Sequence, residues 1–454
     1  MKYFETDKNF WKNVLHIALP ITAQSLITIG VNMMDTIMLG SLGEAALSAS
    51  SLGNQYITFF QICCMGIGMG ASVLTSRYWG KGDFVSMRKA ITIALRFTLA
   101  FAAIFTILNI FATRPILQLY SNEEQIISQG VIYLIWSSPT FILMGLSLVC
   151  TNIMRSVNLV HIPLIASAIS LFVNIGANYI FIFGKFGAPP MGTAGAALGT
   201  VIARVIEVTI ICGSFLFVDK KVGYRIRNLF EKCGDLVREY IRVSIPVLVS
   251  DGLLGLGMNA LGMVMGHIGA SFVAANAITM VTQQLSTVLI QGVSFSSCII
   301  TGHTLGEERV EDAKRQGYTF FWLGLMIGCL AGAIIYIIRT PIINAYNITS
   351  QTKEITEQLM DAISIIVVFQ SANGILTKGV LRGGGDTRFL MLADIFFLWV
   401  VSIPLGAVAG LVWHLPAFWI SICLRIDQII KAIWCVLRLR SGKWIKKIRG
   451  VVAE

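Results

Sequence analysis

The chain has 454 residues, of which 55% are hydrophobic and only 13% are charged. Because a soluble domain carries about 25% charged residues, this composition excludes a water-soluble protein and, with a mean hydropathy of +0.75, indicates an integral membrane protein. The formal net charge is +11, and there are nine cysteines, an odd number. Most of them lie in apolar runs, where they are typical of small buried hydrophobic side chains and not of a disulfide framework.

Long apolar stretches recur from one end of the chain to the other. A helix that crosses a membrane needs about 20 mostly apolar residues, so these stretches predict an all-α integral membrane protein with twelve transmembrane helices. The first stretch is too long, and too rich in Gly and Asn, for a cleaved signal peptide, so we expect it to be retained. The expected spans are residues 13–38, 46–76, 90–112, 126–153, 161–183, 192–218, 239–266, 273–302, 315–338, 355–380, 388–412 and 416–437.

Lysine and arginine are distributed unevenly between the two sides of the membrane. Twelve spans place both termini on one side, and 28 of the 35 basic residues belong to segments on that side, against four on the other side and three within spans. By the positive-inside rule both termini are cytoplasmic, and we expect a multi-pass protein of the cell membrane. A nucleic-acid-binding face would need a folded soluble surface, and no loop is large enough to form one.

The two halves of the chain resemble each other. An offset of 226 residues aligns glycine, proline and tyrosine positions, and one residue of slip aligns Arg155 with Arg382. Six spans per half is an even number, so we expect parallel repeats with a substrate path at their interface. The expected organisation is an N-lobe at 1–218, a cytoplasmic linker at 219–238 and a C-lobe with a basic tail at 239–454. The aligned positions include Pro20 with Pro246, Gly40 with Gly266, Gly80 with Gly306, Pro115 with Pro341 and Tyr120 with Tyr346.

Six carboxylates lie inside the expected spans, and each costs about 2.5–3.5 kcal/mol there on insertion scales. Two of them have a basic residue at helical spacing. Glu207 lies three residues after Arg204, and Asp427 lies four residues before Lys431. Such spacings place both members of a pair on one helical face, so we expect structural ion pairs at both positions.

Three further acids have no basic neighbour at helical spacing. Asp361 and Asp394 lie a few residues inside their spans, where we expect water or headgroups to solvate them, or a capping role. Asp251 lies near mid-depth without a close basic partner. It is a candidate for a second ion site, and hydrogen bonding between helices is the alternative.

Asp35 is the in-span acid that most needs a counter-ion, because no basic residue lies within one or two helical turns of it. In the fifth span Asn174 and Asn178 are four residues apart and share a face, and Thr200 in the sixth span adds a hydroxyl. One carboxylate with neutral oxygens suits a monovalent cation. The alternative is that these polar groups only hold helices together, but the second half lacks the cluster. Its aligned residues are Leu261, Val401 and Leu405.

Five segments between Asn9 and Lys447 carry a family resemblance: ALP at 18–20, NMMDTIMLGSLG at 32–43, NIGANYIFIFG at 174–184, GTAGAALGTVIAR at 192–204 and VLRGGGDTR at 380–388. In their order and spacing the chain resembles the multidrug and toxic compound extrusion (MATE) transporters. The resemblance implies two six-helix lobes that form a V around a central cavity, open alternately to each side. It also implies export of amphipathic, often cationic compounds in exchange for Na+ or H+.

The resemblance points to the same cation site. The family's N-lobe site uses an Asp of the first span, Asn and Asp of the fifth and a Thr of the sixth, and the matching residues here are Asp35, Asn174, Asn178 and Thr200. Asn178 departs from the pattern, since many members have Asp there, which removes one negative charge and one proton acceptor. Leu254 stands where some branches have a Glu in the seventh span, so the resemblance does not carry a C-lobe site to that position.

Two further groups of residues are candidates for the transport path. The stretch Arg382–Arg388 is expected to form a sharp glycine turn in which Asp386 caps the eleventh helix; gating between the lobes, with Arg155 at the aligned position, is the alternative. Flexible methionines suit varied ligands, although packing is their commoner role. The expected cavity residues are Gln24, Asn32, Met33, Asn54, Gln55, Met258, Gln283 and Gln284.

These observations predict a secondary antiporter that exports small amphipathic, cationic compounds by alternating access. An ion gradient is the expected energy source, because no GxxxxGK[ST] phosphate loop occurs, and no cofactor is expected beyond the coupling ion, Na+ or H+. The expected partners are a small-molecule substrate and membrane lipid but no nucleic acid, with a monomer as the functional unit. The alternative is a flippase for a lipid-linked oligosaccharide, which would need a basic central cavity; an enzyme is not expected, since the five histidines form no metal-binding motif.

Overall fold

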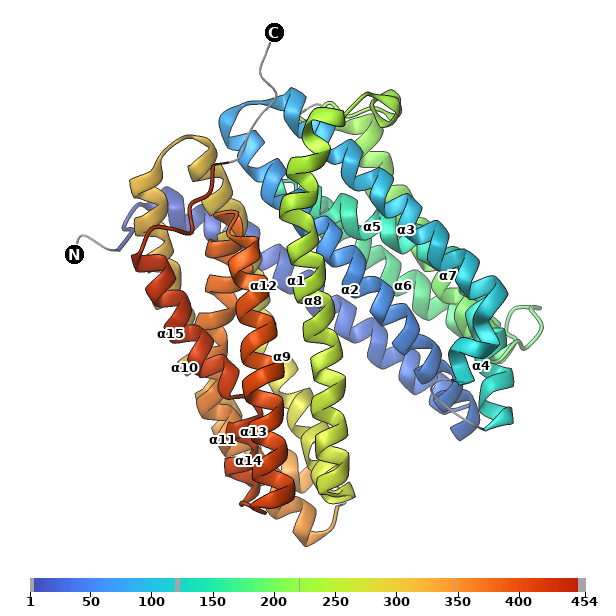
Figure 1. Cartoon of the computed structure of the whole chain (residues 1–454). Coiled ribbons are helices and arrows are strands. Elements are labelled where there is room, and N and C mark those ends of the chain that lie inside the picture. Colours follow the sequence, from blue (N-terminus) through green and yellow to red (C-terminus); the bar gives the residue numbers. More distant parts are fainter. Residues whose placement is uncertain (1–3, 119–122, 220, 347, 448–454) are drawn as a thin grey trace. The chain divides into compact units, whose positions relative to one another are not determined.

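The computed structural model describes residues 4–118, 123–219, 221–346 and 348–447, and their regular structure is helical throughout (Figure 1). Ten described helices are long and apolar enough to cross a membrane, and the count is eleven if the bent pair α4 and α5 forms one span. The all-α, multi-pass membrane fold is therefore confirmed. The first half contains α1 (Lys8–Gly40), α2 (Glu44–Lys81), α3 (Phe84–Gln118), α4 (Glu124–Trp136), α5 (Ser138–Ser156), α6 (His161–Phe183), α7 (Thr193–Gly213), the π-helical η1 (Ser214–Val218) and the 3-10 helix η2 (Ile226–Phe230).

The second half has the same number of expected spans but more interruptions. Three π-helical segments lie in its tenth and eleventh expected spans. Such segments are rare in proteins, and where they occur they are often at functional sites. The elements are α8 (Gly234–Ile268), α9 (Ala270–Gly306), α10 (Val310–Ala345), α11 (Ser350–Gly374), η3 (Ile375–Leu381), α12 (Thr387–Ile395), η4 (Phe396–Ser402), α13 (Ile403–Ala407), η5 (Val408–Val412), α14 (Ala417–Leu424) and α15 (Ile426–Arg440).

Two of the twelve expected spans are broken. The fourth bends by 53° between α4 and α5, where Ser137 separates the helices and a proline occupies the first turn of α5; proline is well tolerated at that position of a new helix. The twelfth breaks at Arg425, which has the non-helical angles φ −125° and ψ 17°. Its halves, α14 and α15, are not among the ten helices that meet the length and hydropathy requirements.

The chain forms two compact units. Of the described residues, the N-unit comprises Ala23–Thr75 and Asp83–Leu248, and the C-unit comprises residues 4–22, 76–82 and 249–447. These units differ from the expected lobes, because the start of α1 groups with the second half and the start of α8 groups with the first. The lobe boundaries at 218 and 239 stay a prediction.

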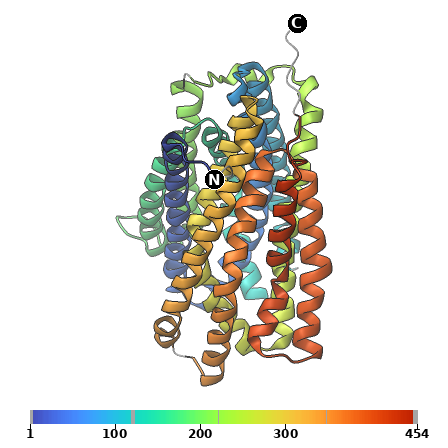
Figure 2. The same ribbon diagram turned by 90° about the vertical axis from the view of Figure 1, so that its left-hand side faces the viewer.

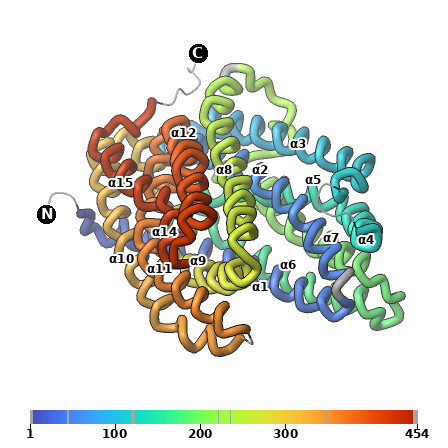
Figure 3. Tube along the Cα trace, turned by 60° about the horizontal axis from the view of Figure 1, so that its bottom comes forward, coloured from blue at the N-terminus to red at the C-terminus, as the bar shows by residue number. Residues whose placement is uncertain are grey.

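Rows of small residues bring helices together inside each unit. In the N-unit, Gly195 and Gly199 lie one turn apart on α7, which packs against α6 (Figure 3). In the C-unit, Gly324, Gly328 and Gly332 lie on the side of α10 that faces α11 (Figure 2); a Cβ at Gly332 would lie 2.3 Å from the carbonyl oxygen of Ser364. Small residues at such spacing let helix backbones approach closely, which is the main source of helix association in a membrane.

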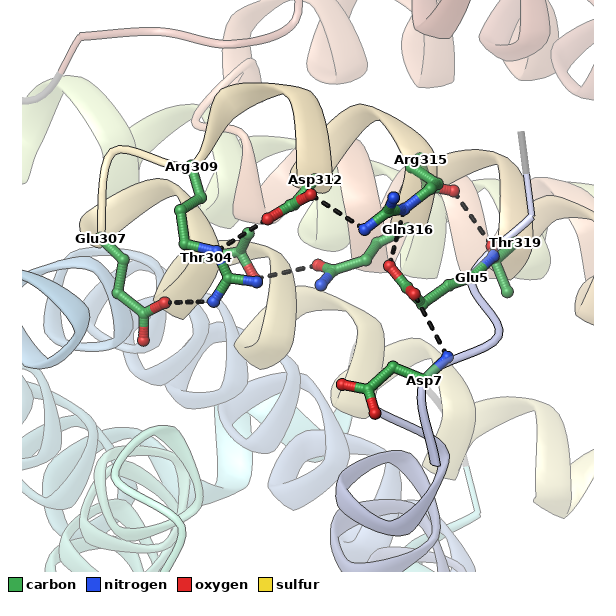
Figure 4. Close-up of polar contacts among 9 residues, drawn as sticks. All are labelled: Glu5, Asp7, Thr304, Glu307, Arg309, Asp312, Arg315, Gln316 and Thr319. Carbon is green, nitrogen blue, oxygen red and sulfur yellow. Dashed lines mark hydrogen bonds and ion pairs between the residues drawn. The ribbon is translucent and has the colours of Figure 1, made fainter. Parts of the chain in front are cut away.

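Polar contacts anchor the N-terminal segment in the C-unit. The backbone N–H of Glu5 donates to Thr319 Oγ1 at 2.8 Å, and Arg315 Nε donates to the Glu5 carboxylate at 2.8 Å (Figure 4). Arg315 also contacts Asp312, one helical turn away. The start of α1 is thereby held against α10.

The expected linker is ordered in the residues that the structure describes. Tyr224 is buried, its hydroxyl lies 2.9 Å from Thr92 Oγ1, and its ring stacks on Phe215. Burial raises the pKa of Tyr224 to about 12. The Asp219 carboxylate accepts hydrogen bonds from the backbone N–H groups of Lys221 and Val222, so this segment is a folded part of the N-unit.

Candidate cation site

Asp35 lies on α1 in the N-unit, beside the fifth expected span. Asn178 Nδ2 of α6 donates to Asp35 Oδ1 at 2.6 Å and also lies 3.4 Å from Asn174 Oδ1. Asp35 is half-buried, whereas Asn174 and Asn178 are buried. The structure therefore brings together three of the four residues in the predicted cation site.

One oxygen in this cluster lacks a partner. Asn178 Oδ1 is fully buried and accepts no hydrogen bond from the described residues. Gly199 of α7 lies directly against it, since a Cβ at Gly199 would be 2.2 Å from this oxygen. A buried amide oxygen without a partner is costly, and a bound cation would remove that cost.

Thr200 follows Gly199 on α7 and is half-buried. Among the contacts of the described residues, none joins Thr200 to Asp35, so the fourth predicted ligand adjoins Gly199 in the chain but is not bonded to the cluster. Its role as a ligand stays a prediction.

The charge of Asp35 is not balanced by an ion pair within the described part of the chain. Arg204, on α7, pairs with Glu207 at 2.6 Å, which confirms the predicted structural pair and explains why that arginine is engaged elsewhere. The half-buried carboxylate of Asp35 and the two amide groups supply hard oxygen ligands. Among the described residues, no base pairs with this carboxylate.

Asp251 was predicted to lack a close basic partner, and that prediction is wrong. Arg382 binds both carboxylate oxygens of Asp251, at 3.0 and 3.2 Å, and the arginine is 3% exposed. The partner lies 131 residues away in the chain, so helical spacing could not identify it.

The expected solvation of Asp394 is also wrong. Asp394 is buried, accepts a hydrogen bond from Ser250 Oγ at 2.6 Å and lies 3.2 Å from Lys431 Nζ. Lys431 contacts Asp427 at 2.9 Å as well, which confirms the second predicted pair.

Asp361 is partly exposed, as expected near a span end, but it also has a partner. Arg339 of α10 donates to its carboxylate, and Glu357 lies 3.7 Å from the same guanidinium. Solvation alone therefore does not account for the charge of Asp361, because Arg339 also balances it.

The predicted cavity residues divide into two groups. Gln24 and Gln283 are buried and bonded inside their own units, so the structure does not support them as cavity residues. Gln24 bonds Ser167 and Arg155, and Gln283 bonds Gln370 and Arg425. The exposed candidates are Asn32, Met33, Asn54, Gln55, Met258 and Gln284.

The glycine turn at 383–385 is present, with Gly385 at φ 80°. Asp386 lies at the N-cap of α12, but its side chain makes no capping hydrogen bond, which corrects the expected capping role. Its carboxylate instead contacts Arg438 at 2.7 Å and Lys446 at 3.3 Å. The Asp386 carboxylate therefore balances two bases instead of capping the backbone N–H groups of α12.

The MatE family model matches residues 20–180 and 237–408, almost three quarters of the chain. The chain belongs to the MATE transporter family. Among relatives of this MATE protein, the probable multidrug resistance protein NorM of Thermotoga maritima is 27% identical over 96% of this chain and 93% of the relative. The multidrug resistance protein MdtK of Yersinia enterocolitica is 24% identical and covers 96% of both chains.

Solved structures share the fold of this MATE protein. A crystal structure of a MATE protein in complex with MaL6 has a TM-score of 0.86 at 19% identity and covers 95% of this chain and 97% of its own. A MOP superfamily transporter from Pyrococcus furiosus also has a TM-score of 0.86 at 19% identity, with 97% and 99% coverage. The family model confirms the predicted family, and these structures show the same fold.

Sequence reasoning missed several residues that the structure joins to this MATE protein's buried charges. Ser250 and Ser402 each bind a buried aspartate of the C-unit, and neither stands out in an apolar helix. The pair Gly195 and Gly199 could have been found, because GAALG at 195–199 has the small-residue spacing typical of close helix contacts.

Proposed function

We propose that the protein is a secondary antiporter of the cell membrane that exports small amphipathic, cationic compounds in exchange for Na+ or H+. The observation that carries this proposal is the Asp35 cluster: a half-buried acid without an ion-pair partner among the described residues, bonded to Asn178, whose own amide oxygen is unsatisfied. The names of the relatives NorM and MdtK, both multidrug resistance proteins, support the export of varied compounds.

In the proposed cycle, Asp35, Asn174 and Asn178 hold the coupling cation, with Thr200 as a further ligand. Binding neutralises Asp35, and release restores its charge. A ligand can shift a two-state equilibrium only if it binds the states with different affinity. The exchange therefore requires that the cluster hold the cation more tightly in one state of alternating access than in the other.

The flippase alternative is less well supported. It needs free basic side chains for a pyrophosphate, but the in-span bases of the C-unit are engaged: Lys431 by two aspartates, and Arg425 by Gln283 at 2.8 Å. Arg382, which lies just after the tenth expected span, is engaged by Asp251. We also propose cytoplasmic termini, from the distribution of basic residues, and a monomer as the functional unit.

The test uses the purified full chain in liposomes with a fluorescent cationic dye, under an imposed Na+ gradient and, separately, a pH gradient. Asp35→Asn should abolish gradient-driven dye export, because it removes the charge that the cation balances. Asp361→Asn is the matched control, since its carboxylate is partly exposed and lies outside the cluster, and it should keep export. Export by Asp35→Asn at the wild-type rate would overturn the coupling role of Asp35.

A further inference from the structure

A second group of buried charges lies in the C-unit, outside the Asp35 cluster. Lys431 Nζ lies 2.9 Å from Asp427 Oδ2 and 3.2 Å from Asp394 Oδ1. Lys431 and Asp427 are each 2% exposed and Asp394 is 6% exposed. One ammonium thus lies between two carboxylates from different spans.

Hydroxyl groups complete the surroundings of the two acids. Ser250 Oγ donates to Asp394 Oδ2 at 2.6 Å, and Ser402 Oγ donates to Asp427 Oδ1 at 3.1 Å. The two carboxylates at the ammonium and the hydroxyls bonded to them are hard oxygen groups, the kind that monovalent cations select.

A polar chain continues from this cluster to an unsatisfied group. Gln428 Nε2 donates to Asp427 Oδ2 at 2.8 Å, and Asn373 Nδ2 donates to Gln428 Oε1 at 2.8 Å. Asn373 is 4% exposed, and its Oδ1 has no partner among the described residues. The π-helical segments η3 and η4 begin directly after Gly374 and Ile395. Unsatisfied buried groups and π-helical turns are both typical of functional sites rather than of plain packing.

The internal repeat relates this cluster to the Asp35 site. The offset of 227 that aligns Arg155 with Arg382 also aligns Ser167 with Asp394, Thr200 with Asp427 and Arg204 with Lys431. At the offset of 226 that applies to the earlier spans, Gln24 aligns with Ser250. The bond from Gln24 to Ser167 at 2.8 Å in the N-unit therefore corresponds to the bond from Ser250 to Asp394 in the C-unit. The same scaffold therefore carries different charges in the two halves.

We propose that Asp394 and Asp427, with Ser250 and Ser402, form a second monovalent-cation site, and that the Lys431 ammonium is its built-in occupant. The lysine supplies the positive charge that a free cation supplies at Asp35. Taking the ammonium away leaves two buried carboxylates facing one space, which a Na+ or a small ammonium ion can fill. One consequence depends on the proposed function: a site with a tethered cation does not exchange it, so coupling uses the Asp35 site alone.

The experiment measures binding of radiolabelled Na+ to the purified full chain. All proteins carry Asp35→Asn, so that the first site is silent and failure of the proposed antiport cannot affect the result. Adding Lys431→Met, which keeps most of the length of the side chain but removes the ammonium, should create saturable Na+ binding that ammonium displaces. Adding Asp427→Asn to that variant should remove the Na+ binding. Lys431→Arg, which keeps a positive charge at this position, should show no saturable Na+ binding.

Thermal stability provides a second measurement in case the Lys431→Met protein folds poorly. In membranes, its melting temperature should rise in Na+ or ammonium relative to choline, a larger cation, whereas the Lys431→Arg protein should not respond. A Lys431→Met protein that binds no Na+ and shows no such stabilisation would overturn the proposal and leave the cluster as a structural ion-pair network.

Discussion

Gly199 on α7 is the residue at which the smallest change should disturb the candidate cation site. A Cβ at this position would lie 2.2 Å from Asn178 Oδ1 and 3.1 Å from the Asn178 backbone nitrogen, and real Cβ atoms essentially never approach a heavy atom within 3.0 Å. Gly199→Ala must therefore turn the Asn178 carboxamide or push α7 away from α6. Either movement disrupts the 2.6 Å hydrogen bond between Asn178 and Asp35.

The size of the effect follows from that hydrogen bond. A bond to a charged group contributes about 1.5–3 kcal/mol, so its loss, together with the displaced amide oxygen, should raise the half-saturating concentration of the coupling cation by about ten- to a hundredfold. Overpacking a well-packed contact costs about 1–3 kcal/mol, so a lower melting temperature is expected as well.

The assay is gradient-driven dye transport in liposomes as a function of cation concentration, with folded protein quantified for each variant. Gly213→Ala is the matched control, because Gly213 ends the same helix and a Cβ there meets no heavy atom within 4 Å. It should leave the half-saturating concentration unchanged. If Gly199→Ala behaves like Gly213→Ala, the close approach of α7 does not position Asn178, and the reasoning is refuted.

Two further predictions concern charge. Asn178→Asp places a second carboxylate at hydrogen-bond distance from Asp35. Since two adjacent like charges disfavour each other, the variant should take up a proton and respond more strongly to a pH gradient than wild type. An unchanged ratio of pH-driven to Na+-driven export would contradict this. Arg382→Met leaves the half-buried Asp251 without its partner and should destabilise the protein by about 3 kcal/mol, measured by thermal unfolding. Adding Asp251→Asn should recover much of the loss, and a single variant that melts like wild type would show that the pair is unimportant.

Features that depend on local periodicity were predictable from the sequence. The helical class and most span positions follow from apolar length, and the pairs Arg204 with Glu207 and Asp427 with Lys431 follow from helical spacing. The contact of Asp35 with Asn178 joins residues 143 positions apart. It was predictable because an acid without a partner and two amides on one face were both conspicuous in apolar spans.

Two charge pairs between distant segments were not predicted, because they depend on how the spans pack. Asp251 and Arg382 are separated by 131 residues and Asp394 and Lys431 by 37, so each acid looked unpaired when only its own helix was considered. The break at Arg425 was also missed, because an apolar count does not show where a buried charge interrupts a helix. The pairing of distant charges is decided by helix packing, which glycine rows such as Gly324, Gly328 and Gly332 control.

Carboxylates inside the spans are balanced differently in the two halves of the chain, and this difference is relevant to function. In the C-unit, the acids Asp394 and Asp427 are balanced by Lys431, so no free ion is needed. In the N-unit, an Asn in place of Asp35 could still bond Asn178 and would avoid the cost of a charge in the membrane. A charge that packing does not need, in a cluster that leaves the Asn178 oxygen unsatisfied, supports our proposal that Asp35 binds and releases a cation.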